Sequence, residues 1–102
     1  MNQKEFYIEL NKFKNGIPEP LHETVAVLSY EVGRMMEQAM YMKWNSDDLA
    51  EVLTRRGFLK SELMDVLAQC ALICEATHTT IEEMLELGME KACERFHKVE
   101  RK

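Results

Sequence analysis

The sequence has few of the residues that break helices and form turns, with four glycines and two prolines among 102 residues. Its eight methionines and 46% hydrophobic content lean towards helix formers rather than towards strand and turn residues. It also has no apolar run near the roughly 20 residues that a membrane-spanning helix needs. We therefore expect an all-α fold that does not cross a membrane.

The chain has three cysteines, and its 13 basic residues are outnumbered by 18 acids. Cys70, Cys74 and Cys93 lie within apolar helical patterns and lack the spacing of a zinc or redox motif, so we expect small core residues. Their odd number, with no apolar signal segment near the N-terminus, favours a cytoplasmic location over secretion. A net charge of -5 and the lack of a basic recognition helix disfavour a nucleic-acid partner.

Apolar residues recur at helical spacing in the first half of the chain. The pattern predicts a helix over residues 3–14, which Asn15-Gly16 should end, and Pro18 and Pro20 mark the link that follows. A second helix is predicted over residues 21–44. The polar residues 45–48 then offer N-caps for a short extra helix over residues 49–56, which Gly57 should end or kink.

The second half of the chain predicts two more helices. Residues 58–76 are apolar almost all round after Glu62, so this stretch should form a central helix that is covered on both sides. Thr80 and Glu83 form a capping box that opens the last helix. The prediction is one domain over residues 1–102, a four-helix bundle with a short extra helix, in which residues 1–20 are an N-terminal helix and linker and residues 21–96 the core. So short a chain buries a modest core, so we expect a homo-oligomer.

The predicted central helix carries two acids, Glu62 and Asp65, three positions apart. This spacing lets both carboxylates converge on one cation, and a magnesium ion would offset the cost of placing them in apolar surroundings. Glu31 lies in a similar apolar setting on the second helix, and antiparallel packing would bring it to the pair, so that three carboxylates and water complete an octahedral site. The alternatives are that Glu62 and Asp65 lie in an exposed first turn and that Glu31 lies on a solvated face.

On the last helix, Lys91 and Arg95 are four positions apart and project on one side, where they could hold phosphates. The alternative is that they serve only as partners of the helix dipole.

Three stretches together resemble the MazG-like, all-α nucleoside triphosphate pyrophosphohydrolases: Leu-Ser-Tyr-Glu-Val-Gly-Arg at 28–34, Ser-Glu-Leu-Met-Asp-Val-Leu at 61–67, and Lys-Ala-Cys-Glu-Arg-Phe at 91–96. That family is marked by an EExxE motif, an ExxD motif on the next long helix, and a Lys and Arg pair on the last helix. The resemblance implies hydrolysis of a nucleoside or deoxynucleoside triphosphate to the monophosphate and pyrophosphate. It also implies magnesium, or manganese, at Glu31, Glu62 and Asp65, phosphate binding by Lys91 and Arg95, and assembly as a dimer or tetramer.

The chain departs from the family in its first motif, where Arg34 stands in place of a metal-binding acid. A cation at this position would repel magnesium. Glu37 on a distorted turn, or a partner subunit, could replace the missing acid. Alternatively, Arg34 contacts the phosphates of the substrate, or the domain has lost catalysis and serves as a nucleotide-binding or oligomeric interaction module.

Overall fold

The structure, a computed structural model, describes residues 1–13 and 19–100, with side chains as far as Phe96. Its elements are α1 (Gln3–Phe13), α2 (Leu21–Trp44), α3 (Leu49–Ala76) and α4 (Ile81–Glu100), and the described residues contain no strand. The all-α prediction is therefore confirmed. The predicted stop at Asn15-Gly16 and the proline at position 18 lie outside the described residues. No helix within the described ranges has the length and apolar character needed to cross a membrane.

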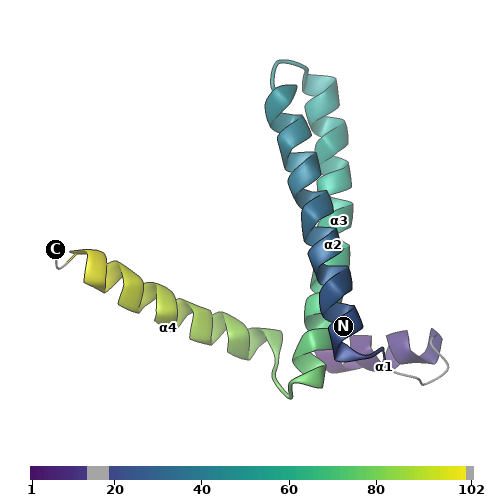
Figure 1. The fold of residues 1–102 in the computed structure, drawn as a ribbon, viewed down its shortest axis with the longest axis vertical. Coiled ribbons are helices and arrows are strands. Elements are labelled where there is room, and N and C mark those ends of the chain that lie inside the picture. Colours follow the sequence, from purple (N-terminus) through teal and green to yellow (C-terminus); the bar gives the residue numbers. More distant parts are fainter. Residues whose placement is uncertain (14–18, 101–102) are drawn as a thin grey trace.

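Helices α2 and α3 form a long antiparallel hairpin, the main body of the fold (Figure 1). The connection is tight, because the Asn45 N–H donates to the Tyr41 carbonyl at 3.0 Å and the Asp48 N–H donates to the Asn45 carbonyl at 2.9 Å. Asp48 then caps α3 as predicted, since its carboxylate accepts from the Glu51 N–H at 3.1 Å. A short connection of this kind fixes the antiparallel pairing of the two helices.

The short extra helix predicted over residues 49–56 is not separate, and this prediction was wrong. Helix α3 continues through Gly57 without interruption. A glycine inside a helix costs only about 1 kcal/mol relative to alanine, and both halves of α3 pack along α2. Val52 and Leu59, on either side of the glycine, are each half-buried, so tertiary packing outweighs the local preference.

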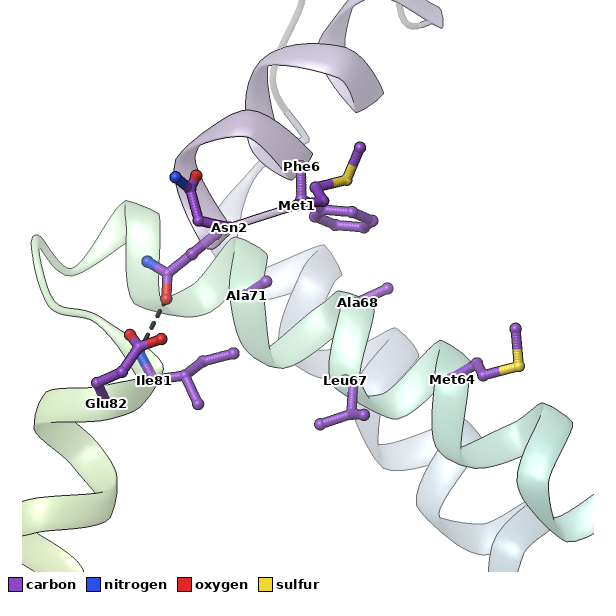
Figure 2. Close-up of a pocket in the computed structure, with 10 residues that line it drawn as sticks. Met1, Asn2, Phe6, Met64, Leu67, Ala68, Ala71, Ile81 and Glu82 are labelled. Carbon is purple, nitrogen blue, oxygen red and sulfur yellow. Dashed lines mark hydrogen bonds between the residues drawn. The ribbon is translucent and has the colours of Figure 1, made fainter.

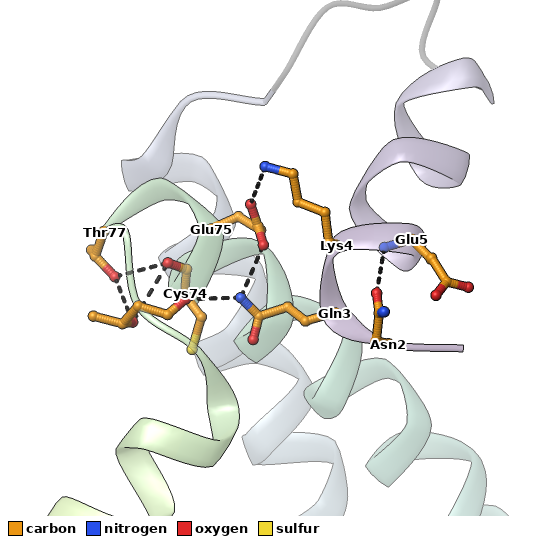
Figure 3. Close-up of polar contacts among 8 residues, drawn as sticks. Asn2, Gln3, Lys4, Glu5, Cys74, Glu75 and Thr77 are labelled. Atoms are coloured by element: carbon orange, nitrogen blue, oxygen red, sulfur yellow. Dashed lines mark hydrogen bonds and ion pairs between the residues drawn. The ribbon is translucent and has the colours of Figure 1, made fainter.

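Helix α1 lies across the end of the hairpin and is fastened there by Gln3 (Figure 3). The Gln3 amide donates to Glu75 Oε1 at 3.1 Å and to the Thr79 carbonyl at 2.9 Å, and its oxygen accepts from the Ile81 N–H at 2.8 Å. Lys4 adds an ion pair with Glu75 at 3.7 Å. One side chain thus joins α1, the end of α3 and the start of α4.

Helix α4 begins at the predicted cap, where the Glu83 N–H donates to Thr80 Oγ1 at 3.0 Å, and then leads away from the hairpin (Figure 1). The prediction that α3 is covered on both sides was wrong, because α4 does not lie along it. The buried apolar residues of the described chain are Ala71, Leu72 and Cys74. Cys70 is half-buried and Cys93 is exposed, so Cys93 is not the core residue that its pattern suggested.

Candidate metal centre

Three acids meet at the middle of the hairpin. Glu62 lies in the middle of α3 and is 8% exposed, so the alternative that it occupies an exposed first turn is wrong. Asp65 follows one turn later and is exposed, and Glu31 is half-buried in the middle of α2. Because the helices are antiparallel, their midpoints face each other, and one carboxylate oxygen from each acid lies within 4.8 Å of the others.

Arg34 lies beside this acidic cluster of Glu31, Glu62 and Asp65 and contacts it directly. Its Nε donates to Glu62 Oε1 at 2.8 Å, and its Nη1 donates to the Tyr30 hydroxyl at 2.9 Å. The guanidinium also lies 5.6 Å from the centre of the Tyr30 ring. This charge-assisted hydrogen bond lowers the pKa of Glu62 below its ordinary value of 4.5, and it raises the pKa of Arg34 in turn.

Two buried oxygens of the cluster lack donors. Oε2 of Glu31 and Oε2 of Glu62 are both buried and accept no hydrogen bond from the described residues. The pKa of Glu31 is raised above 4.5, first because a protonated Glu31 can donate to Glu62, then because of burial and the nearby negative charges. Two adjacent buried carboxylates need a proton or a cation between them.

The donor set is one that a hard cation favours. All three ligands are carboxylate oxygens, Asp65 opens the cluster to solvent, and two of the buried oxygens are unsatisfied. Magnesium takes a few carboxylates and keeps several waters, so three acids at a solvent-accessible edge fit its coordination. The residues present therefore fit magnesium or manganese, although Arg34 already holds one oxygen of Glu62.

The chain itself does not bring Lys91 and Arg95 to this cluster. Both are exposed on α4, which leads away from the hairpin (Figure 1). Among the described residues neither forms an ion pair with the three acids. The structure thus unites Glu31, Glu62 and Asp65 with Arg34 and separates them from the predicted phosphate-binding pair.

Sequence reasoning missed Tyr30, whose hydroxyl holds the far end of the Arg34 guanidinium. The signal was present in the spacing, because residues 30 and 34 are one turn apart and face the same side of α2.

Comparison of the chain with protein-family models, with curated proteins and with solved structures finds no match. The resemblance to MazG-like enzymes therefore rests on the three sequence motifs alone and stays a prediction.

Proposed function

We propose that this chain hydrolyses a nucleoside triphosphate, or its deoxy form, to the monophosphate and pyrophosphate in a magnesium-dependent reaction. The observation that carries the proposal is the pair of buried Oε2 atoms on Glu31 and Glu62 without donors, next to the exposed carboxylate of Asp65. A divalent cation would satisfy both oxygens at once. Manganese, which prefers the same oxygen ligands, would serve as well.

Bound magnesium would supply charge neutralisation on the phosphates and a water of lowered pKa for attack on phosphorus. The residues of the chain would hold and orient the reactants. Glu62 is fixed by burial and by Arg34, so its carboxylate is positioned before substrate arrives. Asp65 is exposed and could accept a proton from an attacking water. Arg34, whose side chain is 46% exposed, could donate its remaining guanidinium N–H groups to phosphate oxygens while it holds Glu62.

Lys91 and Arg95 enter this proposal as phosphate-binding residues supplied by a second copy of the chain. In a single copy α4 carries them away from the cluster (Figure 1). A dimer or larger homo-oligomer would thus complete the site.

A second candidate function is a nucleotide-binding or oligomeric interaction module without catalysis. The Arg34–Glu62 contact at 2.8 Å favours it, because a fixed cation already neutralises the most buried acid of the cluster. Such a domain would keep the fold and lose the metal.

The test is to incubate the purified protein with magnesium and a panel of nucleoside and deoxynucleoside triphosphates and to measure pyrophosphate. We expect release by the wild type, loss of release in Glu62→Gln, and full release in Glu86→Gln, which removes an exposed carboxylate on α4. No release by the wild type, together with release by Arg34→Glu, would reject the enzyme and support a decayed site. If neither the wild type nor Arg34→Glu releases pyrophosphate, and magnesium with nucleotide does not raise the melting temperature of the wild type, the result would favour the interaction module.

A further inference from the structure

Gln69 on α3 holds a buried oxygen that has no hydrogen-bond donor. The residue is half-buried, but its Oε1 atom is closed to solvent and accepts no hydrogen bond from the described residues. Among the buried and half-buried residues that the structure describes, three side-chain oxygens share this property, and the other two are Oε2 of Glu31 and Oε2 of Glu62. A buried acceptor without a donor costs stability, so native proteins keep few of them, and each one calls for a ligand or an ordered water.

Gln69 lies on the side of α3 that carries the acidic cluster. At about 100° per residue, it falls about 20° from Glu62 and about 40° from Asp65 round the helix axis. It is one turn beyond Asp65, about 6 Å along the axis, and residues four apart on a helix are neighbours. The register therefore places the Gln69 side chain next to Asp65.

The part of α2 that faces Gln69 offers no donor. Arg34 contacts Glu62, and each step forward along α3 is a step back along antiparallel α2, so Gln69 faces the region of residue 27. Residues 25–28 are Val-Ala-Val-Leu and carry no polar side chain. The hydroxyl of Thr24 is already used, because it donates to the backbone carbonyl four residues before it at 3.4 Å.

The hollow between α1, α3 and the start of α4 lies on another side of α3 (Figure 2). It has a volume of about 390 Å³, and Leu67 and Ala71 are among the residues that line it from α3. Both are about 160° round the helix axis from Gln69. The polar residues that line the hollow from α1, Asn2 and Gln3, therefore do not face Gln69. A donor for its Oε1 atom has to come from outside the described chain, on the side of the acids.

The chemistry of the proposed reaction limits what this donor can be. Ionised phosphate and carboxylate oxygens accept hydrogen bonds and donate none, so neither the triphosphate nor the acidic cluster can supply it. A water next to Asp65 has two hydrogens to donate. If one hydrogen points to Asp65 and the other to the Gln69 amide oxygen, the water is held at both ends and its lone pairs are free.

We propose that Gln69 positions the attacking water, with its Oε1 atom accepting one hydrogen of the water while Asp65 accepts the other. This inference rests on the proposed function. The water oxygen forms a bond to phosphorus, one proton passes to Asp65, and the bond from that phosphorus to its bridging oxygen breaks, with the electron pair leaving on that oxygen. An amide oxygen takes no proton at neutral pH, so Gln69 orients the water and Asp65 is the base.

The test makes one substitution at two glutamines of the hairpin. Gln69→Met keeps the length of the side chain and removes the acceptor. Gln38→Met is the matched control, because Gln38 is 8% exposed and its Oε1 atom accepts from Arg55 at 3.4 Å. With magnesium and the triphosphate that the wild type hydrolyses fastest, we expect the kcat of Gln69→Met to fall by about 10-fold to 100-fold at unchanged KM, as misplacement of a reactant does. Gln38→Met should keep the wild-type kcat.

Thermal unfolding with chelator present gives a readout without metal or substrate. Gln69→Met should raise the melting temperature by on the order of 5 °C, because it removes a buried acceptor that lacks a donor. Gln38→Met should lower the melting temperature, because Arg55 loses an acceptor. A gain in stability together with a loss of kcat is a result that a merely structural role of Gln69 would not give.

The outcomes separate this inference from the proposed function. Wild-type kcat in Gln69→Met, with pyrophosphate release by the wild type, would overturn the inference and leave the proposed function standing. A rise in KM alone would overturn it as well, because Gln69 would then contact the substrate rather than the water. So would a Gln69→Met protein that melts below the wild type, since Oε1 would then have a resident partner in the metal-free protein. No release by the wild type would overturn both.

Discussion

Two isosteric substitutions in the acidic cluster should change stability in opposite directions. In Glu31→Gln and Glu62→Gln the same carboxylate-to-amide change is made within one cluster, on acids whose pKa values move oppositely. We expect that Glu31→Gln stabilises the metal-free protein at neutral pH and that Glu62→Gln destabilises it.

The sign for Glu31 follows from its raised pKa. A carboxyl group that is harder to ionise in the folded state than in the unfolded state costs stability as pH rises from 4.5 through its folded pKa, and the full cost remains above it. Glutamine cannot ionise, so Glu31→Gln removes this cost. Its amide can also donate to the carboxylate of Glu62 whatever the pH, whereas Glu31 can donate only when protonated.

The sign for Glu62 is the reverse, because its pKa is lowered by Arg34. The ionised group stabilises the fold above pH 4.5, and this stabilisation is lost as pH falls through the folded pKa. Glu62→Gln removes the charge that receives the Arg34 hydrogen bond at 2.8 Å.

The magnitudes follow from counting hydrogen bonds. Glu62→Gln weakens one charge-assisted hydrogen bond, and Glu31→Gln adds one hydrogen-bond donor. A single bond of this kind moves the melting temperature of a domain of this size by on the order of 5 °C. The assay is thermal unfolding monitored by circular dichroism, with chelator present and at one protein concentration, at pH 7 and at pH 4. Both differences should be smaller at pH 4, and Glu86→Gln should match the wild type. Shifts of the same sign at pH 7 would refute the reasoning.

Three further changes test the cluster, the hairpin and the core. Magnesium or manganese at about 100 times its dissociation constant should raise the melting temperature by roughly 10 °C, and a Glu62→Gln protein that gains as much would contradict the assigned ligands. Asp48→Ala, which removes the cap on the Glu51 N–H, should cost about 1 kcal/mol in urea unfolding, with Asp47→Ala as the control. Leu72→Ala should cost roughly 2–5 kcal/mol, because that side chain is 8% exposed; a loss as small as that of Leu53→Ala would show that the core lies elsewhere.

The ends of the helices were predictable because they depend on neighbouring residues. Asp48 caps α3 and Thr80 caps α4 through hydrogen bonds to N–H groups three residues on. The predicted break at Gly57 failed because continuity there depends on packing against α2, which lies far away in the sequence. A local signal worth about 1 kcal/mol does not decide such a case.

The candidate site was predictable in part for a similar reason. Spacing alone put Glu62 and Asp65 one turn apart, and an antiparallel hairpin then brings Glu31 to them. The contact between Arg34 and Glu62 joins residues 28 positions apart and depends on the side-chain conformation of Arg34, which Tyr30 fixes. Repulsion of a metal by Arg34 could be argued from the sequence, but the ion pair that now holds Glu62 could not.

The course of α4 shows a limit of periodicity itself. Met84, Leu85 and Phe96 lie on the apolar side of α4, and the chain leaves them 41%, 68% and 67% exposed. Removing an apolar helix side from water lowers the free energy whichever molecule covers it. A second copy of the chain can therefore cover such a side as well as the same chain can. The start of α4 is held to α1 by the hydrogen bonds of Gln3 with Thr79 and Ile81, which join residues more than 70 positions apart.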